Sequence, residues 1–527
     1  MPQSRSAPDV HGVGSLGDLI RLATLRFADR EAVVCGEDRF TYRAFAEATG
    51  RVVAVFKAAG LRRGDGLAMI AANGPEVLFV MAAAHAMGLR YSALHPMGSL
   101  ADHAFILEDA EIAALVVDAE AHAQRGRELK HGAGAALRCV FAIGPADFAP
   151  DLHRAMADAG PSPLEVEASE ADIWSVMYTG GTTGRPKGVV HSHRTAVVGA
   201  LLQLAEWEWP AECRFLAATP VSHVAAGMLP PTLLRGGAFH MMRAFDPEAF
   251  LAAIEREAIT ATFLVPTMLY RLLDHPRLRD FDLSSLQMVI YGAAPMSPAR
   301  LQAALDVFGP VFCQLYAQSE CPCSITYLRK GDHAPARAHR LASCGQPVAG
   351  VNLRLLDPQG RSVAPGDVGE ICVRGPTVMQ GYWRRPEETA EALREGWLHT
   401  GDLARQDEDG FLYIVDRAKD MVISGGFNVY PREVEDALMA HEAVAAAAVI
   451  GVPDAVWGEA VRALVVLRSG HEVDADGLRA FVRERKGPVA CPKEVEFVSG
   501  LPTTSVGKID KKAIRARFWA DASRQVS

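Results

Sequence analysis

Short apolar runs alternate with longer amphipathic segments along most of the chain. Glu31–Cys35, Gly66–Ala71 and Ala113–Val117 are apolar runs of strand length, whereas Tyr42–Ala59 and Pro75–Met87 repeat apolar residues at helical spacing. Strands that alternate with helices favour parallel sheets in layered α/β domains. The first part of the chain is therefore predicted to form such a layered domain.

The same alternation returns in the middle of the chain. It predicts strands at Phe215–Thr219, Ala261–Val265 and Met288–Tyr291, and helices at Asp246–Glu257 and Ser297–Val307. From Gly345 to Tyr382 the pattern changes, because short apolar runs are interrupted by Pro and Gly. This change predicts a small β-rich subdomain with strands such as Val351–Leu356 and Gly369–Val373.

A smaller unit begins after about Asp416. Helices are predicted at Pro431–Met439 and Asp476–Arg485, with strands near Val444–Gly451 and Val461–Leu467. The predicted fold is thus α/β. It has a large N-terminal domain of layered α/β subdomains with the small β-rich subdomain (residues 1–416), and a small, mobile C-terminal α+β domain (residues 417–527).

Composition narrows the class of protein. A chain of 527 residues with 49% hydrophobic and 22% charged residues can bury a large core, which excludes disorder as its main state. A net charge of −9 argues against binding to nucleic acid or acidic membranes, but leaves room for a small anion in a local basic pocket. The sequence has no apolar run of about 18 residues, no signal-peptide pattern at its start and no regular spacing of cysteines. We therefore predict a cytoplasmic protein without a transmembrane segment.

The segment Tyr178-Thr-Gly-Gly-Thr-Thr-Gly-Arg-Pro-Lys187-Gly carries the clearest chemistry. It follows the apolar run Ile173–Met177, which is predicted to be a strand. Glycine turns expose backbone N–H groups and threonines add hydroxyl donors, as an anion site for phosphate requires. Lys187 adds a positive point charge. Two residues separate Gly184 from Lys187 and no Gly-Lys-Ser/Thr tripeptide is present, so this is not a Walker A loop.

This segment closely resembles the signature loop of the adenylate-forming superfamily, which includes acyl- and aryl-CoA synthetases, peptide-synthetase adenylation domains and beetle luciferases. The family's other motifs follow in the same order up to residue 508, and the resemblance spans nearly the whole chain. It implies that the loop binds the phosphates of ATP through Thr179, Gly180, Gly181, Thr182, Thr183 and Lys187.

Two further segments are implied to bind the nucleotide. Tyr316-Ala-Gln-Ser-Glu320 resembles the family's Tyr-Gly-x-Thr-Glu motif, where the hydroxyl residue (here Ser319) meets the α-phosphate and the acid (Glu320) binds Mg²⁺, a cation that prefers carboxylate oxygens. Ala317 replaces the usual glycine. Tyr291-Gly-Ala-Ala-Pro295 resembles the segment whose backbone contacts adenine. The residues implied to bind AMP here are Ala293, Ala294, Gln314 and Tyr316.

The later motifs are implied to complete the site. Asp402, in Trp397-Leu-His-Thr-Gly-Asp402, would accept hydrogen bonds from both ribose hydroxyls. Arg417 would contact the ribose and Lys419 would be the hinge between the domains. Lys508, in Pro502-Thr-Thr-Ser-Val-Gly-Lys508, would be the catalytic lysine. Gly425 and Gly426 would lie beside the pantetheine of coenzyme A, where glycine permits close approach of the backbone.

The segment from Pro220 to Gly227 matches the family's carboxylate-binding position. The resemblance implies that His223 acts in catalysis beside the carboxylate and that Val224, Gly227 and Ala317 line an acyl pocket. These small apolar residues leave room for a hydrophobic tail. His191 and His193, which resemble a metal pair, are interpreted as structural residues at the start of the helix after the phosphate loop.

The resemblance implies an AMP-forming acid–thiol ligase. A carboxylic acid would react with ATP and Mg²⁺ to give an acyl adenylate and pyrophosphate, and coenzyme A would then take the acyl group and release AMP. Medium- or long-chain fatty acids are favoured, with aryl or arylpropenoic acids next. An enzyme that loads a carrier protein and a non-catalytic relative that only binds nucleotide or acyl chains are the alternatives. The predicted partners are these small molecules, with no nucleic acid, and a homodimer is compatible with the prediction.

Overall fold

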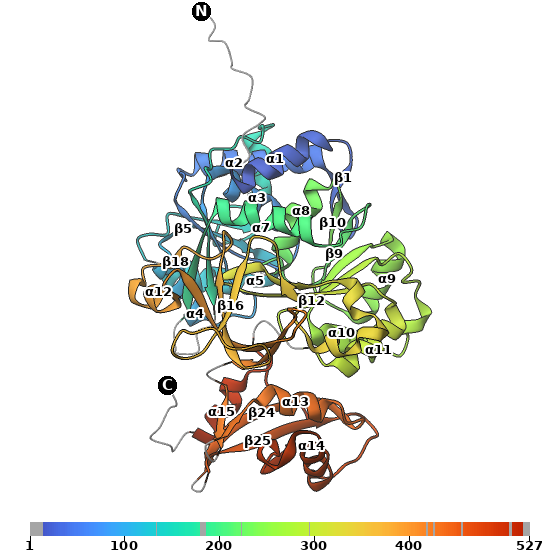
Figure 1. The fold of residues 1–527 in the computed structure, drawn as a ribbon. Coiled ribbons are helices and arrows are strands. Elements are labelled where there is room, and N and C mark those ends of the chain that lie inside the picture. The colour runs from blue at the N-terminus through green and yellow to red at the C-terminus, as the bar shows by residue number, and fades with distance from the viewer. Residues whose placement is uncertain are drawn as a thin grey trace, which may run out of the picture.

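A large body and a smaller C-terminal lid make up the molecule, and the lid (red) lies below the body in Figure 1. The computed structural model describes residues 14–132, 134–179, 186–222, 224–294, 296–417, 420–424, 427–454, 457–504 and 508–519. The predicted α/β fold class is confirmed.

A nine-stranded sheet forms one half of the body. Its order is β15-β14-β13-β12-β11-β9-β10-β1-β2, and its central pairs from β13 to β1 are all parallel. The antiparallel strands β2, β14 and β15 lie at the two edges. The bounds, in chain order, are β1 Glu31–Cys35, β2 Asp38–Thr41, β9 Arg214–Ala217, β10 Ala238–Met241, β11 Ala261–Leu264, β12 Met288–Gly292, β13 Phe312–Gln318, β14 Cys321–Leu328 and β15 Gln346–Pro347.

A seven-stranded sheet forms the other half, in the order β18-β8-β7-β4-β3-β5-β6. Strands β3 to β7 run parallel, whereas β7, β8 and β18 pair antiparallel at one edge. The bounds are β3 Gly66–Ile70, β4 Arg90–Ala93, β5 Ile112–Asp118, β6 Cys139–Ile143, β7 Ile173–Thr179, β8 Lys187–Ser192 and β18 Gly381–Tyr382.

The predicted β-rich subdomain is a five-stranded sheet. Strands β16, β17, β20 and β19 follow one another in it, and β21 pairs with β20. Its strands are β16 Asn352–Leu356, β17 Gly369–Arg374, β19 Leu393–Arg394, β20 Trp397–Gln406 and β21 Leu412–Arg417. The short strands β15 and β18, which lie in the same stretch of sequence, instead extend the edges of the two large sheets.

The lid has its own five-stranded sheet. Its strands are β22 Val422–Ser424, β23 Phe427–Val429, β24 Val444–Asp454, β25 Gly458–Leu467 and β26 Glu494–Phe497. Because β21 ends at Arg417 in the body and β22 begins at Val422 in the lid, the chain passes between the two sheets at residues 418–421. The hinge at Lys419, which lies outside the described residues, stays a prediction.

Fifteen α-helices lie within the described residues. They are α1 Leu16–Arg26, α2 Tyr42–Ala58, α3 Pro75–Met87, α4 Leu100–Asp109, α5 Ala119–Gly132, α6 Leu152–Ala159, α7 His193–Glu206, α8 Leu229–Leu234, α9 Pro247–Glu257, α10 Pro266–Leu273, α11 Pro298–Phe308, α12 Pro386–Ala392, α13 Pro431–Met439, α14 Ala475–Ala490 and α15 Lys511–Trp519. Among these helices, none combines the length and apolar character needed to span a bilayer.

Helix α3 lies within the main hydrophobic core. Every residue of α3 except Glu76 is buried, so this helix is apolar around its whole circumference. It begins with Pro75 at its first turn and ends at Gly88, whose φ of 69° is a left-handed conformation that suits glycine. The core cluster that contains α3 also includes residues from both large sheets, so the two halves of the body share one core.

Candidate functional site

Two predicted nucleotide segments lie side by side at the carboxyl ends of parallel strands. Strand β12 ends at Gly292 and pairs with β13, where Gly292 lies opposite Leu315. A Cβ at Gly292 would come within 2.6 Å of the carbonyl oxygen of Leu315, so only glycine fits here. The next residue, Ala293, has a φ of 66°, which is strained for alanine and redirects the backbone of the predicted adenine segment. Ligands of open α/β sheets bind at this edge.

Asp402 is the centre of a buried hydrogen-bond network. Its Oδ2 accepts bonds from the hydroxyl of Tyr316 at 2.6 Å and from Nε2 of Gln318 at 2.5 Å, while its Oδ1 lies 3.1 Å from Nε of Arg417. Asp402 is only 4% exposed, and strand pairing places it opposite Arg417 in the β20–β21 hairpin. The structure thus brings the predicted residues Tyr316, Asp402 and Arg417 together.

The charges converge on Arg417. Its pKa is raised, chiefly by the carboxylate of Asp402, with a smaller contribution from Glu320. Glu320 lies in the turn between β13 and β14. The carboxylates of Asp402 and Glu320, which are predicted to bind the ribose and Mg²⁺, thus both act on the guanidinium of Arg417. Gln314 lies on β13, opposite Tyr291 of β12 and two residues before Tyr316.

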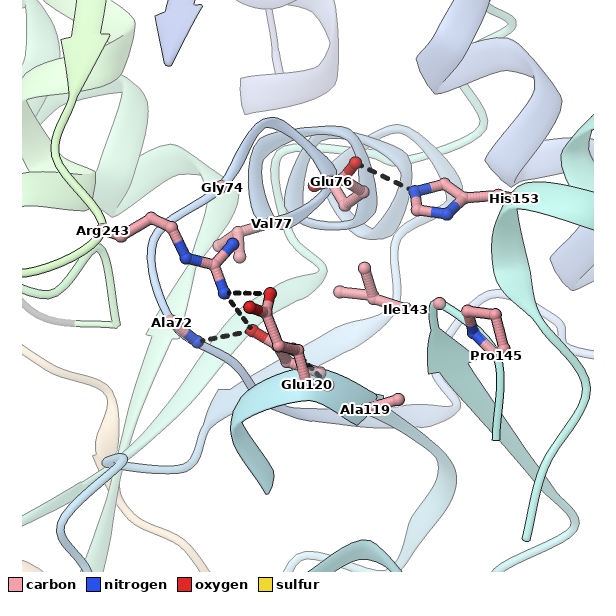
Figure 2. Close-up of a pocket in the computed structure, with 12 residues that line it drawn as sticks. Ala72, Gly74, Glu76, Val77, Ala119, Glu120, Ile143, Pro145, His153 and Arg243 are labelled. Carbon is pink, nitrogen blue, oxygen red and sulfur yellow. Dashed lines mark hydrogen bonds and ion pairs between the residues drawn. The ribbon is translucent and has the colours of Figure 1, made fainter. Parts of the chain in front are cut away.

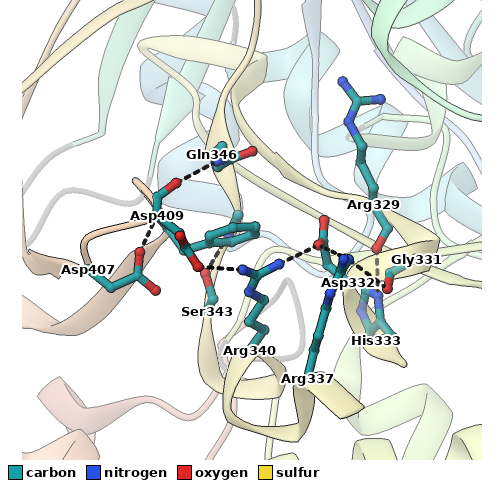
Figure 3. Close-up of polar contacts among 12 residues, drawn as sticks. Arg329, Gly331, Asp332, His333, Arg337, Arg340, Ser343, Gln346, Asp407 and Asp409 are labelled. Carbon is teal, nitrogen blue, oxygen red and sulfur yellow. Dashed lines mark hydrogen bonds and ion pairs between the residues drawn. The ribbon is translucent and has the colours of Figure 1, made fainter. Parts of the chain in front are cut away.

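The hairpin that carries Asp402 and Arg417 is anchored at its far end by a second network, shown in Figure 3. Arg340 bridges Asp332 at 2.9 Å and Asp409 at 2.7 Å, and its guanidinium lies 3.9 Å from the ring centre of Phe411. Ser343 Oγ also donates to the backbone oxygen of Leu412. These contacts tie the β20–β21 turn to the segment after β14 and so fix the hairpin relative to the nine-stranded sheet.

Lys508 lies in the lid, in the loop before α15, where its N–H donates to Oγ1 of Thr504 and its carbonyl accepts the N–H of Thr504. Its side chain keeps contact with solvent, but the surrounding protein displaces enough water to lower its pKa. Repulsion by Arg417 lowers that pKa further and attraction to Asp402 opposes the effect, so the charges of the predicted ribose residues act on this ammonium.

The lowered pKa gives a testable pH dependence. We expect adenylate formation to slow at alkaline pH with an apparent pKa below the usual lysine value of about 10.4, because an ammonium that is needed to neutralise phosphate charge is lost as the pH rises through its pKa. The pH–rate profile of ATP–pyrophosphate exchange measures this limb. A Lys508→Arg variant keeps its charge and should lose the limb, and a limb that remains would assign the titration to another group.

The phosphate loop connects two paired strands. Thr179 and Lys187 lie opposite each other in the last pair of the β7–β8 hairpin before its connecting loop. Gly180, Gly181, Thr182 and Thr183 lie outside the described residues, so their predicted phosphate contacts stay a prediction. The ammonium of Lys187 lies 5.3 Å from the ring centre of Tyr382, whose hydroxyl donates to Oε1 of Glu320 at 2.8 Å.

His191 is not at a helix start, contrary to the sequence interpretation. It belongs to strand β8, and only His193 begins helix α7, with Ser192 as its N-cap. His191 is fully buried and its pKa is lowered to about 4, so the ring is neutral. Its Nε2 donates to the backbone oxygen of Ser319 at 2.7 Å, which holds the Ser319–Glu320 turn in place.

Glu320 fits the role of a cation ligand. Tyr382 occupies Oε1, and within the described residues Oε2 has no hydrogen-bond partner, which leaves one carboxylate oxygen for a hard cation such as Mg²⁺. Donor atoms of Glu370, Cys372 and His399 also gather within 4.8 Å of one another. However, Arg394 Nη2 lies 2.7 Å from Nδ1 of His399, so a guanidinium already supplies positive charge there.

The predicted acyl residues lie on one side of the main core. Val224 and Gly227 belong to the 3-10 helix η1 (Val224–Met228), and both Val224 and Ala317 are half-buried and pack against the core. In addition to the phosphate-loop residues, the predictions for His223, Lys419, Gly425 and Gly426 fall outside the described residues and stay predictions.

A separate polar cavity of about 330 Å³ lies where β3, β5 and β6 end (Figure 2). Its charged residues are paired, Arg243 with Asp118 and Glu120, and His153 with Glu76, so the acids outnumber the bases. None of its lining residues belongs to the predicted site. The predicted nucleotide residues therefore lie apart from this cavity.

The sequence did not indicate two residues that support the predicted site, Gln318 and Tyr382, and although His191 was interpreted as structural, its partner was not foreseen. Gln318 lies within the Tyr316–Glu320 motif, and its period-two spacing from Tyr316 could have placed it on the same face. Tyr382 and His191 contact partners 62 and 128 residues away, so no local pattern indicates their roles.

Comparison with known proteins agrees with this geometry. Residues 21–383 match the model of the AMP-binding enzyme family, and residues 433–508 match the AMP-binding enzyme C-terminal domain. The chain is 46% identical over 524 residues to a medium/long-chain-fatty-acid–CoA ligase (FadD8) of Mycobacterium tuberculosis, covering 97% of this chain and 91% of that protein. It is 40% identical over 489 residues to a feruloyl-CoA synthase of an Amycolatopsis species, covering 92% and 96%.

A solved structure shows the same arrangement of the chain. The amide bond synthetase McbA of Marinactinospora thermotolerans superposes with a TM-score of 0.88 at 35% identity, covering 95% of this chain and 100% of that one. Together with the family match over both parts of the chain, this shows that the protein belongs to the adenylate-forming family of AMP-binding enzymes.

Proposed function

We propose that the protein activates a hydrophobic carboxylic acid with ATP and transfers the acyl group to coenzyme A. The observation that carries this proposal is the buried network that joins Asp402 to Tyr316, Gln318 and Arg417. Such a carboxylate suits the ribose of a nucleotide, and the ammonium of Lys508, on which Asp402 and Arg417 act, would meet the α-phosphate.

The first step joins the acid to AMP. A carboxylate oxygen attacks the α-phosphorus of ATP, the bond to the bridging oxygen breaks, and pyrophosphate leaves with the bonding electron pair. Lys508 would hold the carboxylate and the α-phosphate in line, and Lys187 would neutralise charge on the phosphates. Mg²⁺ bound at Glu320 would supply further neutralisation of the phosphate charge when it is present. Tyr316, Gln318 and Arg417 fix Asp402 for the ribose.

The second step needs a thiol site. The thiolate sulfur of coenzyme A attacks the acyl carbon, the bond to the phosphate oxygen breaks, and AMP leaves. An exposed aromatic surface on the lid supports this acceptor: Phe427 and Trp457 are 59% and 44% exposed, and Lys493 Nζ lies 4.6 Å from the ring centre of Trp457. Ser424, the residue before the predicted glycine turn, pairs with Gly458, the residue after Trp457. Such a surface suits stacking of adenine and binding of a phosphate.

The acid is proposed to be a medium- or long-chain fatty acid. Small apolar residues of η1 and of β13 (Val224, Ala226 and Ala317) pack against the core at the predicted carboxylate end, and side chains this small would leave space for a tail. The two relatives named above act on fatty and on arylpropenoic acids, and the fatty-acid relative has the higher identity. Arylpropenoic acids are therefore the next candidates.

A panel of acids tests this function. We expect ATP–pyrophosphate exchange and acyl-CoA formation to be fastest with octanoate to palmitate, slower with ferulate, and at background with acetate or phenylalanine, because a roomy apolar pocket gains binding free energy from each buried methylene, about 0.8 kcal/mol. Mass spectrometry of the thioester is the measurement, with an acyl carrier protein as a parallel acceptor. Exchange with no acid would refute the enzyme, preference for acetate or phenylalanine would refute the apolar pocket, and thioester on the carrier alone would refute coenzyme A.

A further inference from the structure

Tyr382 connects the two charged groups that are proposed to bind the phosphates and their cation. Its hydroxyl donates to Oε1 of Glu320 at 2.8 Å, and the face of its ring lies 5.3 Å from the ammonium of Lys187. Lys187 begins β8 in the seven-stranded sheet, whereas Glu320 lies in the turn after β13 of the nine-stranded sheet. The two charges therefore come from different sheets. Tyr382 is a side chain that touches both.

The backbone of Tyr382 is fixed on both sides. Strand β18 pairs with β8, with Gly381 opposite Val190 and Tyr382 opposite Val189. The tyrosine is thus hydrogen-bonded, through its strand, to the strand that begins at Lys187. Its N–H donates to Oγ1 of Thr389 at 2.9 Å. A Cβ at Gly381 would come within 2.7 Å of Cγ2 of Thr389, and Gly381 has a φ of 147° that favours glycine. The strand therefore has little freedom to move the ring.

The Tyr382 hydroxyl is the donor in its bond with Glu320, because a carboxylate oxygen can only accept. The backbone of Glu320 is held as well, because its carbonyl accepts the N–H of Met379 at 2.8 Å. With the backbone and Oε1 both fixed, the direction of Oε2 is fixed too.

We propose that Tyr382 is a positioning residue, which orients the carboxylate of Glu320 so that Oε2 binds the divalent cation on ATP, and which couples this carboxylate to Lys187. This inference rests on the proposed nucleotide and cation roles of Lys187 and Glu320. It adds a residue from the β18 edge strand that touches neither nucleotide nor acid and acts through Glu320.

A Tyr382→Phe substitution tests the inference because it removes the hydroxyl and keeps the ring beneath Lys187. Isothermal titration calorimetry on the full chain gives the affinities for AMP, for ATP without Mg²⁺ and for ATP with Mg²⁺. We expect the gain in ATP affinity that Mg²⁺ provides to fall on the order of tenfold, as loss of a hydrogen bond to a charged group implies. The affinities for AMP and for Mg²⁺-free ATP should be unchanged.

Two controls separate positioning from a structural role. Tyr413→Phe removes the same atom from a tyrosine that donates to Asp407 at 2.9 Å, and it should leave the Mg²⁺ effect intact. In a Glu320→Gln background, Tyr382→Phe should cause no further loss, because a residue that acts only through Glu320 has nothing left to orient.

Each other outcome overturns the inference. An unchanged Mg²⁺ effect in Tyr382→Phe, an equal loss of AMP affinity, or additive losses in the double variant would each contradict it. Because binding is measured without an acid or coenzyme A, a failure of the proposed ligase reaction shows up separately, as absence of acyl-CoA from a wild-type protein that still binds ATP with Mg²⁺.

Discussion

Replacing Lys508 with alanine is expected to reduce acyl-adenylate formation by about three orders of magnitude, while coenzyme A still reacts with an acyl adenylate supplied ready-made. The charges of Asp402 and Arg417 act on this ammonium, and in the proposed first step it would hold two anions, the carboxylate and the α-phosphate, against their mutual repulsion. Positioning and charge neutralisation of this kind each contribute factors of about 10²–10³ or more. In the second step the carboxylate has already been neutralised as an anhydride, so the lysine is no longer required.

The two half-reactions are measured separately, by ATP–pyrophosphate exchange and by thioester formation from synthetic acyl adenylate. Lys512→Ala is a matched control, because Lys512 is exposed on helix α15 only four residues further along. It should leave both rates within a factor of two or so of wild type, as surface substitutions usually do. Equal loss of both half-reactions in Lys508→Ala would show that the lysine supports the fold of its loop and not the chemistry of one step.

The fold could be predicted where local chemistry decides the structure. The bounds of α3 were predicted to the residue because Pro75 and Gly88 frame a largely apolar segment, and β1 was predicted because its apolar run has strand length. The periodicity also indicated parallel sheets. It could not show that β8, β14 and β18 close the edges antiparallel, since pairing direction depends on contacts between segments far apart in sequence.

Only those site residues that lie within recognisable motifs could be predicted from the sequence. Asp402, Arg417 and Lys508 were identified from a resemblance, and the structure joins Asp402 to Arg417 in an ion pair whose charges act on Lys508. Tyr382 and His191 show which roles the motifs could not indicate. Each supports the Ser319–Glu320 turn across 62 or more residues, and each would pass for an ordinary core residue when only its neighbours in sequence are known.

Lys419→Pro is expected to impair thioester formation by about a hundredfold and adenylate formation only slightly. The arrangement in which Asp402 acts on Lys508 suits the first step, and in the proposed second step the thiol would need the space of this lysine. The lid would then rotate, with residues 418–421 linking the two sheets. Two contacts across this link are the ion pair of Arg405 with Glu433 and the hydrogen bond from the N–H of Arg432 to the carboxylate of Asp416 at 3.1 Å. The ion pair is partly exposed, and such pairs contribute only about 0–1 kcal/mol, so it would not prevent rotation.

Proline tests rotation itself because its ring fixes φ near −65° and also restricts the residue before it. Lys419→Ala is the matched variant, since it removes the same charge but keeps the backbone free, and it should retain most of the thioester rate. A loss in alanine as large as that in proline would assign the effect to the ammonium. Normal rates of the proline variant in both half-reactions would show that the hinge is at another residue of 418–421. An equal fall in both rates would show that the substitution disturbs the lid as a whole. Only a selective loss in proline, spared in alanine, ties the second half-reaction to a backbone rotation at this residue.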